Sequence, residues 1–187
     1  MSSDMEFREL ANLRHSTRAF DARPVSDADL LRILATAERA PSAGNLQSYQ
    51  IVVVRDLHRR ARLGEAAHEQ RFIVSAPVHL VFLADTTRSS ARYADRGWFF
   101  AVEDATLAAA YAQLAAADIG LASAWIGSFD DEEVQEILSA PKEATAVCIL
   151  AVGHGAEASE PTSRLPIREV VRAETCDGRA WTPVLVS

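Results

Sequence analysis

The chain has 187 residues, of which 49% are hydrophobic and 24% are charged, and it carries a formal net charge of -7. This length suits one domain, and this composition predicts a packed core, which argues against a disordered chain. The excess of acidic residues argues against nucleic acid or an anionic membrane surface as the main partner. We therefore expect one domain over residues 1–187 with neither nucleic acid nor membrane as a partner.

The cellular compartment is predicted from the apolar runs and the cysteines. The first residues lack the apolar core of a signal peptide, and no apolar run approaches the ~20 residues of a membrane span. The two cysteines, Cys148 and Cys176, show no metal-ligand spacing, and Cys148 lies in an apolar run typical of a core. Neither a metal site nor a disulfide framework is predicted, and a reducing cytoplasm fits best.

The first half of the chain carries two helix-start signals. Ser3 and Ser26 are each followed three residues later by an acidic residue, the pattern of a capping box. Pro41 cannot continue the second of these helices. In chain order, this half predicts a helix over 4–13, a helix from Ser26 to Ala40, a strand over 51–54, a helix over 56–69 and a strand over 78–84.

The second half is dominated by an alanine-rich helix over 98–118, which closes at Gly120. Its apolar residues lie on more than one side, so it is buried inside the domain or against another subunit. Strands are predicted over 121–126 and 145–152, with a short helix between them that Asp130 caps. Strands alternating with helices indicate an α/β or α+β sandwich.

The C-terminal residues 155–187 contain three prolines and little periodicity. A long arm with weak structure of its own is uncommon in a compact domain. Such an arm usually wraps around something, often a partner subunit, and we expect this segment to do so.

The most informative motif is Arg14-His15-Ser16-Thr17-Arg18, directly after the first helix. In an extended segment, Arg14, Ser16 and Arg18 alternate and share one side. That side is cationic and rich in hydrogen-bond donors, which suits a phosphate or another anion. A solvated basic turn is the alternative, because short charged clusters are usually surface features.

Three further motifs follow in order along the chain. A loop of small residues precedes the first strand and lets a flat ligand approach its backbone, although this motif alone favours an ordinary helix-to-strand turn. Trp125 is typical of a core, and an arginine beside prolines is typical of a surface. The three motifs are Pro41-Ser42-Ala43-Gly44-Asn45-Leu46-Gln47, Ala124-Trp125-Ile126-Gly127-Ser128 and Ser163-Arg164-Leu165-Pro166.

Together these four segments resemble the nitroreductase family of flavin enzymes, over about residues 8–172. The resemblance implies an α+β fold, an α/β sandwich whose central mixed sheet is flanked by helices. It also implies an intertwined homodimer with two FMN sites at the subunit interface, in which the arm over 155–187 embraces the other subunit.

The resemblance also implies roles for single residues. Arg14 and Ser16 match the residues that bind the FMN phosphate, with His15 between them, and Arg164 matches a second phosphate-binding arginine. Arg18 matches a basic residue beside the flavin ring, where a guanidinium would stabilise the negative charge of reduced flavin. The remaining matches contact the ring: Pro41, Ser42, Ala43 and Asn45 from the other subunit, the backbone of Ile126 and Gly127, and Gln70 at the pyrimidine edge.

The implied activity is transfer of electrons from NADH or NADPH through flavin N5 to a small electron-poor acceptor, a nitroaromatic or a quinone. One site for both steps predicts ping-pong kinetics. The sequence has no G-x-G-x-x-G motif for a nicotinamide cofactor and no nucleophile–base pair, so the reductant would stack on flavin and no catalytic side chain is predicted.

Alternatives remain open at this stage. The same fold serves flavin fragmentation, dehalogenation and azoline oxidation, and a non-enzymatic FMN-binding sensor or a dimer without cofactor is a further possibility. Two departures from the family pattern bear on the site. Thr162 stands where many members carry a basic residue, and Ser48-Tyr49 replaces a proline and a tryptophan.

Overall fold

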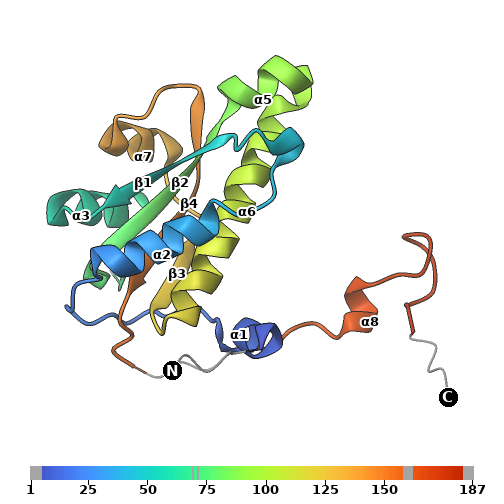
Figure 1. The fold of residues 1–187 in the computed structure, drawn as a ribbon, viewed down its shortest axis with the longest axis horizontal. Coiled ribbons are helices and arrows are strands. Elements are labelled where there is room, and N and C mark those ends of the chain that lie inside the picture. The colour runs from blue at the N-terminus through green and yellow to red at the C-terminus, as the bar shows by residue number, and fades with distance from the viewer. Residues whose placement is uncertain (1–5, 69, 71, 158–161, 183–187) are drawn as a thin grey trace.

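The computed structural model describes residues 6–68, 70, 72–157 and 162–182 (Figure 1). Its centre is a four-stranded sheet in which every neighbouring pair is antiparallel. Helices cover both faces of this sheet, so the expected α+β class is confirmed. In spatial order the strands are β1 (Tyr49–Val54), β2 (Val78–Asp85), β4 (Ala144–Gly153) and β3 (Ala122–Ile126).

The expected mixed sheet is wrong for these four strands. In the described ranges, the parallel pairing beside the sheet is one isolated bridge between Ser16 and Ser123. Further along the same segment, Phe20 bridges Gly155 in the antiparallel sense.

The two central strands are buried on both faces. Val78, Leu80 and Phe82 pack with the core under α2 (Asp27–Ala37) and α6 (Gly97–Asp118). Val81 and Leu83 pack with the opposite core. Continuous apolar runs are typical of strands covered on both sides. The helices of the opposite face are α3 (Leu57–Ala66), α4 (Phe72–Ser75) and α7 (Asp131–Leu138).

The predicted caps and strands agree with the structure within a few residues. The Ser26 hydroxyl accepts a 3.1 Å hydrogen bond from the Asp29 amide. The Asp130 carboxylate accepts one of 2.9 Å from the Glu133 amide. Gly120 follows α6 with φ +77°, as a helix C-cap requires. The predicted central elements therefore exist where the sequence placed them.

Helix boundaries account for two corrections. The first helix, α1 (Phe7–Leu13), begins at Phe7 and not at residue 4, and Glu6 precedes it without a side-chain cap. Ser3 of the predicted capping box lies outside the described residues. Helix α2 ends at Ala37 and passes into a turn before Pro41, so it is shorter than predicted.

Five short helical segments carry no periodic signal in the sequence. Helix α5 shows why, because it buries only Ser89 and has no apolar stripe. A helix without a buried stripe cannot be recognised by hydrophobic periodicity. These segments are α4, α5 (Thr86–Tyr93), α8 (Ile167–Val170) and the 3-10 turns η1 (Ala43–Asn45) and η2 (Ala94–Arg96).

Helix α1 and the segment around Ile167–Val170 lie beside the sandwich and not within it (Figure 1). Helix α1 has no buried residue. Gly155 and the Ala156 amide still pair with the segment before Asp21, so the C-terminal extension leaves the body after residue 157. In residues 162–182, the extension contains α8 and one antiparallel bridge, between Arg172 and Ala180. None of the described helices has the length and apolarity needed to cross a membrane.

Candidate functional site

The Arg14 segment follows α1 along the edge of β3. The Arg14 amide donates to the Leu10 carbonyl at 3.0 Å and closes the helix, after which the backbone is extended. The Thr17 amide then donates to the Ser123 carbonyl at 2.9 Å. The segment is therefore fixed between the end of α1 and the first residues of an edge strand.

A cavity of about 350 Å³ opens beside this segment. Arg14, His15 and Thr17 line it, together with residues from the end of α6 and the start of β3. The His15 Nδ1 donates to the Leu13 carbonyl at 2.8 Å, which fixes the ring orientation. Glu157 also lines the cavity, so an anion there needs more positive charge than Arg14 alone supplies.

Ser16 and Arg18 do not line this cavity, although simple alternation grouped them with Arg14. Ser16 is half-buried against Ser123, and Arg18 is exposed. Only the first part of the basic motif therefore faces a common space.

The small-residue loop before β1 has a tightly determined backbone. Gly44, Asn45 and Gln47 have positive φ values of 56°, 58° and 45°. The Gln47 side-chain amide donates to Asn45 Oδ1 at 2.8 Å and to Ser42 Oγ at 3.2 Å. These hydrogen bonds pair polar groups of the loop with one another. The sequence identified the loop, but not that the Gln47 amide is already engaged in it.

Asp104 of α6 anchors this loop and was missed in the sequence. Its carboxylate accepts 2.7 Å and 3.1 Å hydrogen bonds from the amides of Ala43 and Ser48, and it is 1% exposed. A signal was available, because a carboxylate inside an alanine-rich buried helix needs hydrogen-bond donors. Burial first, and then the carboxylates of Glu38 and Asp104, raise the pKa of neighbouring Tyr49.

Helix α5 holds the same loop from its other side. Arg88 Nη1 donates to the Gln47 carbonyl at 2.8 Å, and Arg92 Nη1 donates to the Gly44 carbonyl at 3.4 Å. The loop is thus clamped between α5 and α6.

The remaining predicted residues are dispersed. Ile126 is buried at the end of β3, so only its backbone can reach a ligand there, and Gly127 after it is exposed. The Gln70 carbonyl accepts from the Ile73 amide at 3.1 Å, ahead of α4. Arg164 is exposed in the extension, where its Nη1 donates to Thr162 Oγ1 at 2.7 Å.

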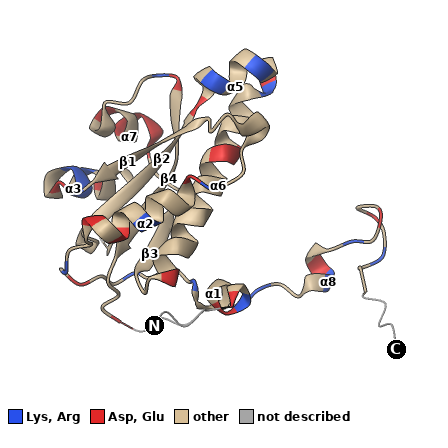
Figure 2. Ribbon diagram, in the orientation of Figure 1, with Lys and Arg blue, Asp and Glu red and all other residues tan. Residues whose placement is uncertain are grey.

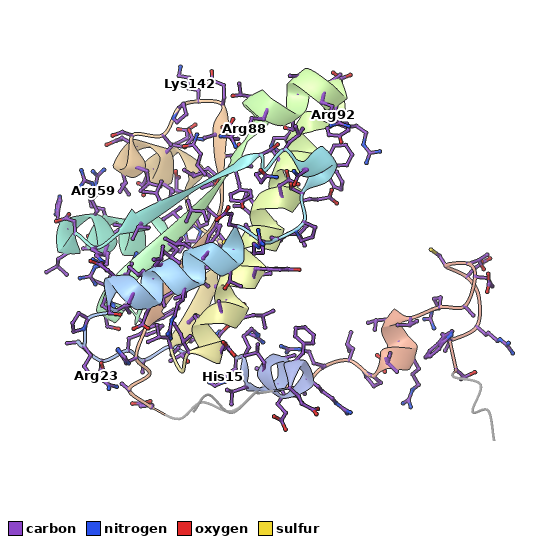
Figure 3. The ribbon with its side chains drawn as sticks, in the orientation of Figure 1. His15, Arg23, Arg59, Arg88, Arg92 and Lys142 are labelled. Atoms are coloured by element: carbon purple, nitrogen blue, oxygen red, sulfur yellow. The ribbon has the colours of Figure 1, made fainter. Side chains whose placement is uncertain are left out.

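Within one chain, the Arg14 cavity and the loop lie at opposite ends of α6. Figure 3 places His15 at one end and Arg88 and Arg92 at the other. Asp104 at the loop and Ala117 at the cavity are separated by about 20 Å along the helix, at ~1.5 Å per residue. The structure therefore brings Arg14 together with His15, but not with the loop, and Arg164 is outside the cavity lining.

Residues 12–154, from the end of α1 through β4, match the sequence profile of the Nitroreductase family. The chain belongs to the nitroreductase family. The stretch that matches includes the Arg14 segment, the clamped loop and all four strands of the sheet.

Relatives of this nitroreductase-family chain cover most of its length. It is 34% identical over 195 residues to an NADH dehydrogenase of Thermus thermophilus, across 89% of this chain and 95% of the relative. It is 31% identical over 174 residues to the FMN reductase (NAD(P)H) of Bacillus subtilis, across 86% of this chain and 70% of the relative. The solved structure of B. megaterium NfrA2 matches it with a TM-score of 0.85 and 30% identity, across 91% of this chain and 74% of that one.

Proposed function

We propose that this protein is an FMN-dependent oxidoreductase that moves electrons from NADH or NADPH to a nitroaromatic or a quinone. The observation that carries the proposal is the Arg14–His15 cavity at the edge of β3, in a member of the nitroreductase family. The name of the Bacillus subtilis relative supports the choice of FMN and of a nicotinamide nucleotide. Bound FMN would supply two-electron chemistry that no side chain of the chain offers.

The Arg14–His15 cavity is our candidate site for the phosphate end of FMN. Arg14 would form charge-assisted hydrogen bonds with the phosphate, and His15 and Ser16 would flank it. Glu157 in the lining opposes an anion, so a second guanidinium is needed. We assign that role to Arg164, which comes from the C-terminal extension. Thr162, which now accepts from Arg164, would release it to the phosphate.

The clamped loop fits the flat ring end of FMN. Pro41, Ser42, Ala43 and Asn45 offer small side chains and a fixed backbone, so a planar ligand can lie close to them. The backbone of Ile126 and Gly127 and the amide of Gln70 would contact the ring from the β3 side. Arg18 is exposed and would stabilise negative charge on reduced flavin.

The separation of these two ends supports an FMN site shared by two chains. The phosphate would lie in the cavity of one subunit and the ring against the loop of its partner, in a homodimer. An apolar hollow of about 340 Å³ between α1, α2 and α6 offers a surface for that partner. Phe7, Leu10 and Tyr111 line it.

The extension also supports this dimer. We propose that residues 155–187 act as an arm that wraps around the partner. Leu165, Ile167, Val170 and Trp181 are between 45% and 67% exposed in the single chain, and such a density of exposed apolar side chains marks an interaction surface. Both cysteines are free thiols, which supports the reducing cytoplasm as the compartment.

An absorbance spectrum of the purified protein, before and after anaerobic addition of NADH or NADPH, tests the proposal. We expect flavin bands that bleach with the reductant and return after a nitroaromatic or a quinone is added. Flavin bands that do not bleach would instead support a specialised flavin enzyme or an FMN-binding sensor. A protein that neither carries nor takes up FMN would contradict the proposal.

A further inference from the structure

Three arginines gather on the outer side of the clamped loop. Arg88 and Arg92 are neighbours one turn apart on α5, and Arg96 follows in η2. All three are exposed. Figure 2 shows the concentration of basic residues on α5, and Figure 3 shows Arg88 and Arg92 at this end of the molecule. We call Arg88, Arg92 and Arg96 the arginine cluster.

None of the described ion pairs includes an arginine of the cluster, although Asp95 stands next to Arg96 in η2. The ion pairs in the described ranges join Asp21 to Arg23, Asp27 to Arg55 and Glu136 to Arg62. Asp85 lies near the cluster, but its carboxylate accepts from the Thr87 amide and from Gln50. Guanidiniums close together repel one another. The chain is acidic overall, so carboxylates that could pair with these arginines are plentiful elsewhere in it. An external anion is the missing partner.

The guanidiniums are held in place and still have free donors. Arg88 and Arg92 each use one nitrogen to bind a loop carbonyl. Arg92 lies 5.6 Å from the Tyr93 ring centroid, and Arg96 lies 4.9 Å from that of Phe100. The Tyr93 and Phe100 rings are themselves 4.7 Å apart. Since a guanidinium carries five N–H donors, most of them remain available to a ligand.

Exposed aromatic rings beside the cluster point to a nucleotide. Trp98 is 55% exposed and Phe99 is 46% exposed, both at the start of α6. Large apolar rings at a surface offer a stacking face for a base, and guanidiniums beside them offer donors for phosphates. A small inorganic anion would need the arginines but not the rings.

We propose that the arginine cluster binds the 2′-phosphate of NADPH while its adenine stacks on Trp98, since Arg96 already lies 5.6 Å from the Phe99 ring centroid. This inference rests on the proposed function, in which a nicotinamide nucleotide approaches flavin held by the adjacent loop. A phosphate monoester carries a charge of about -1.5 to -2 at pH 7, which suits several guanidiniums. NADH lacks this group, so the cluster makes NADPH the preferred reductant.

Calorimetry on the protein as purified tests the cluster without turnover. The probes are adenosine 2′,5′-bisphosphate and adenosine 5′-phosphate. We expect tighter binding of the bisphosphate, by about tenfold for one desolvated charge-assisted contact. Arg96→Ala should remove most of this preference, because Arg96 makes no described contact with the loop. Arg96→Lys keeps the charge and should retain part of it.

Two further variants separate phosphate binding from a general disturbance. Trp98→Ala should weaken both probes in parallel, since both contain adenine. Arg59→Ala is the matched control, because Arg59 is an exposed arginine on α3 at another part of the surface (Figure 3). It should change neither affinity. Equal binding of both probes by the unaltered protein, or equal losses in Arg96→Ala, would overturn the assignment.

Steady-state kinetics distinguish this inference from the proposed function. The ratio of kcat/KM for NADPH to that for NADH should exceed one and fall in Arg96→Ala. Flavin that bleaches equally fast with both nucleotides would leave the proposed function intact and refute the cluster. A clear preference for the bisphosphate in a protein whose flavin never bleaches would support the cluster as a phosphate site and contradict the proposed function.

Discussion

The two ends of α6 differ in how completely one chain builds them. At its N-terminal end, the loop over 41–48 is bonded to Asp104, Arg88 and Arg92 and has little left to form. At its C-terminal end, the cavity holds Arg14 beside a carboxylate, and the extension lies outside the body. The first end is preorganised, whereas the second needs another element to become an anion site.

The loop end of α6 is complete once one chain has folded, whereas the cavity end becomes complete only when subunits assemble in the proposed dimer. A ring-binding loop that is rigid before the cofactor arrives loses little entropy when it binds. A phosphate site that is completed by an arm binds its cofactor only when the arm is in place. In the proposed dimer, cofactor retention and subunit association are therefore linked, and four experiments can break or sharpen this contrast.

Removal of residues 162–187 should have the largest effect. The sheet and the clamped loop should remain folded, because none of the described residues 162–182 is buried. The dimer and the bound FMN should both be lost. Sedimentation and the flavin spectrum give the two readouts, with far-UV circular dichroism as the check on folding. A truncated protein that stays dimeric and yellow would refute the wrapping arm.

Asp104→Ala tests the preorganised end. It leaves the amides of Ala43 and Ser48 without their acceptor, and each unsatisfied buried donor costs ~1–3 kcal/mol, so we expect a loss of about 3 kcal/mol. Urea unfolding measures the change. Asp104→Asn keeps one acceptor oxygen and should lose less. If the alanine variant unfolds like the unaltered protein, the loop does not depend on this anchor.

Acid should lower the stability of the whole fold, and so of both ends of α6, because it protonates a buried histidine in the central sheet. His79 in β2 is buried, with Nε2 donating to the Ile73 carbonyl at 2.7 Å, and burial lowers its pKa to about 4. Between pH ~6.5 and ~4, this histidine is protonated in the unfolded chain but neutral in the folded one. The free energy of unfolding therefore falls as the pH drops through this range.

The expected loss from His79 is at most about 3 kcal/mol over that pH range. Urea unfolding at several pH values measures it. His79→Gln removes this titration, so the difference between the two pH profiles isolates the contribution of His79. Parallel profiles would show that His79 does not carry this part of the acid sensitivity.

Arg14→Ala gives the smallest effect and probes the incomplete end. Loss of one charge-assisted phosphate contact should weaken FMN binding by ~1.5–3 kcal/mol. Fluorescence titration of FMN into the apoprotein measures the affinity. Arg18→Ala is the comparison, because Arg18 lies outside the cavity lining. It should retain FMN but lower the flavin reduction potential. Unchanged affinity in Arg14→Ala would remove Arg14 from the phosphate site.

The sequence predicted the elements whose signals are local. The Ser26 and Asp130 caps, the apolar runs of β2 and β4 and the long helix before Gly120 each reflect a propensity or a period that a short window contains. It did not predict α5, whose polar residues bury too little to leave a pattern. The mixed sheet that the family resemblance implied is also wrong for these four strands, which pair in the antiparallel sense.

For the site, the sequence supplied candidates but not their grouping. It named Arg14, the loop and Arg164, yet their distribution over the two ends of α6 depends on tertiary packing. The sequence analysis singled out neither Asp104 nor the arginine cluster, because charged residues in helices usually lie at the surface without a specific role. Only burial distinguishes Asp104, and only its absence from the described ion pairs distinguishes Arg96.

The conformation of Gly44 limits which sequences this region accepts. A Cβ atom at this position would lie 2.6 Å from Tyr93 Oη and 2.8 Å from Arg92 Nη1. With φ at +56° as well, another residue would displace the ends of the Tyr93 and Arg92 side chains and strain the backbone. A saturation library at this position should therefore favour glycine, whereas Trp98 and Phe99 nearby are exposed and carry no such backbone constraint. Selection for activity on new electron acceptors would then change exposed side chains around the loop, while the loop backbone itself stays the same.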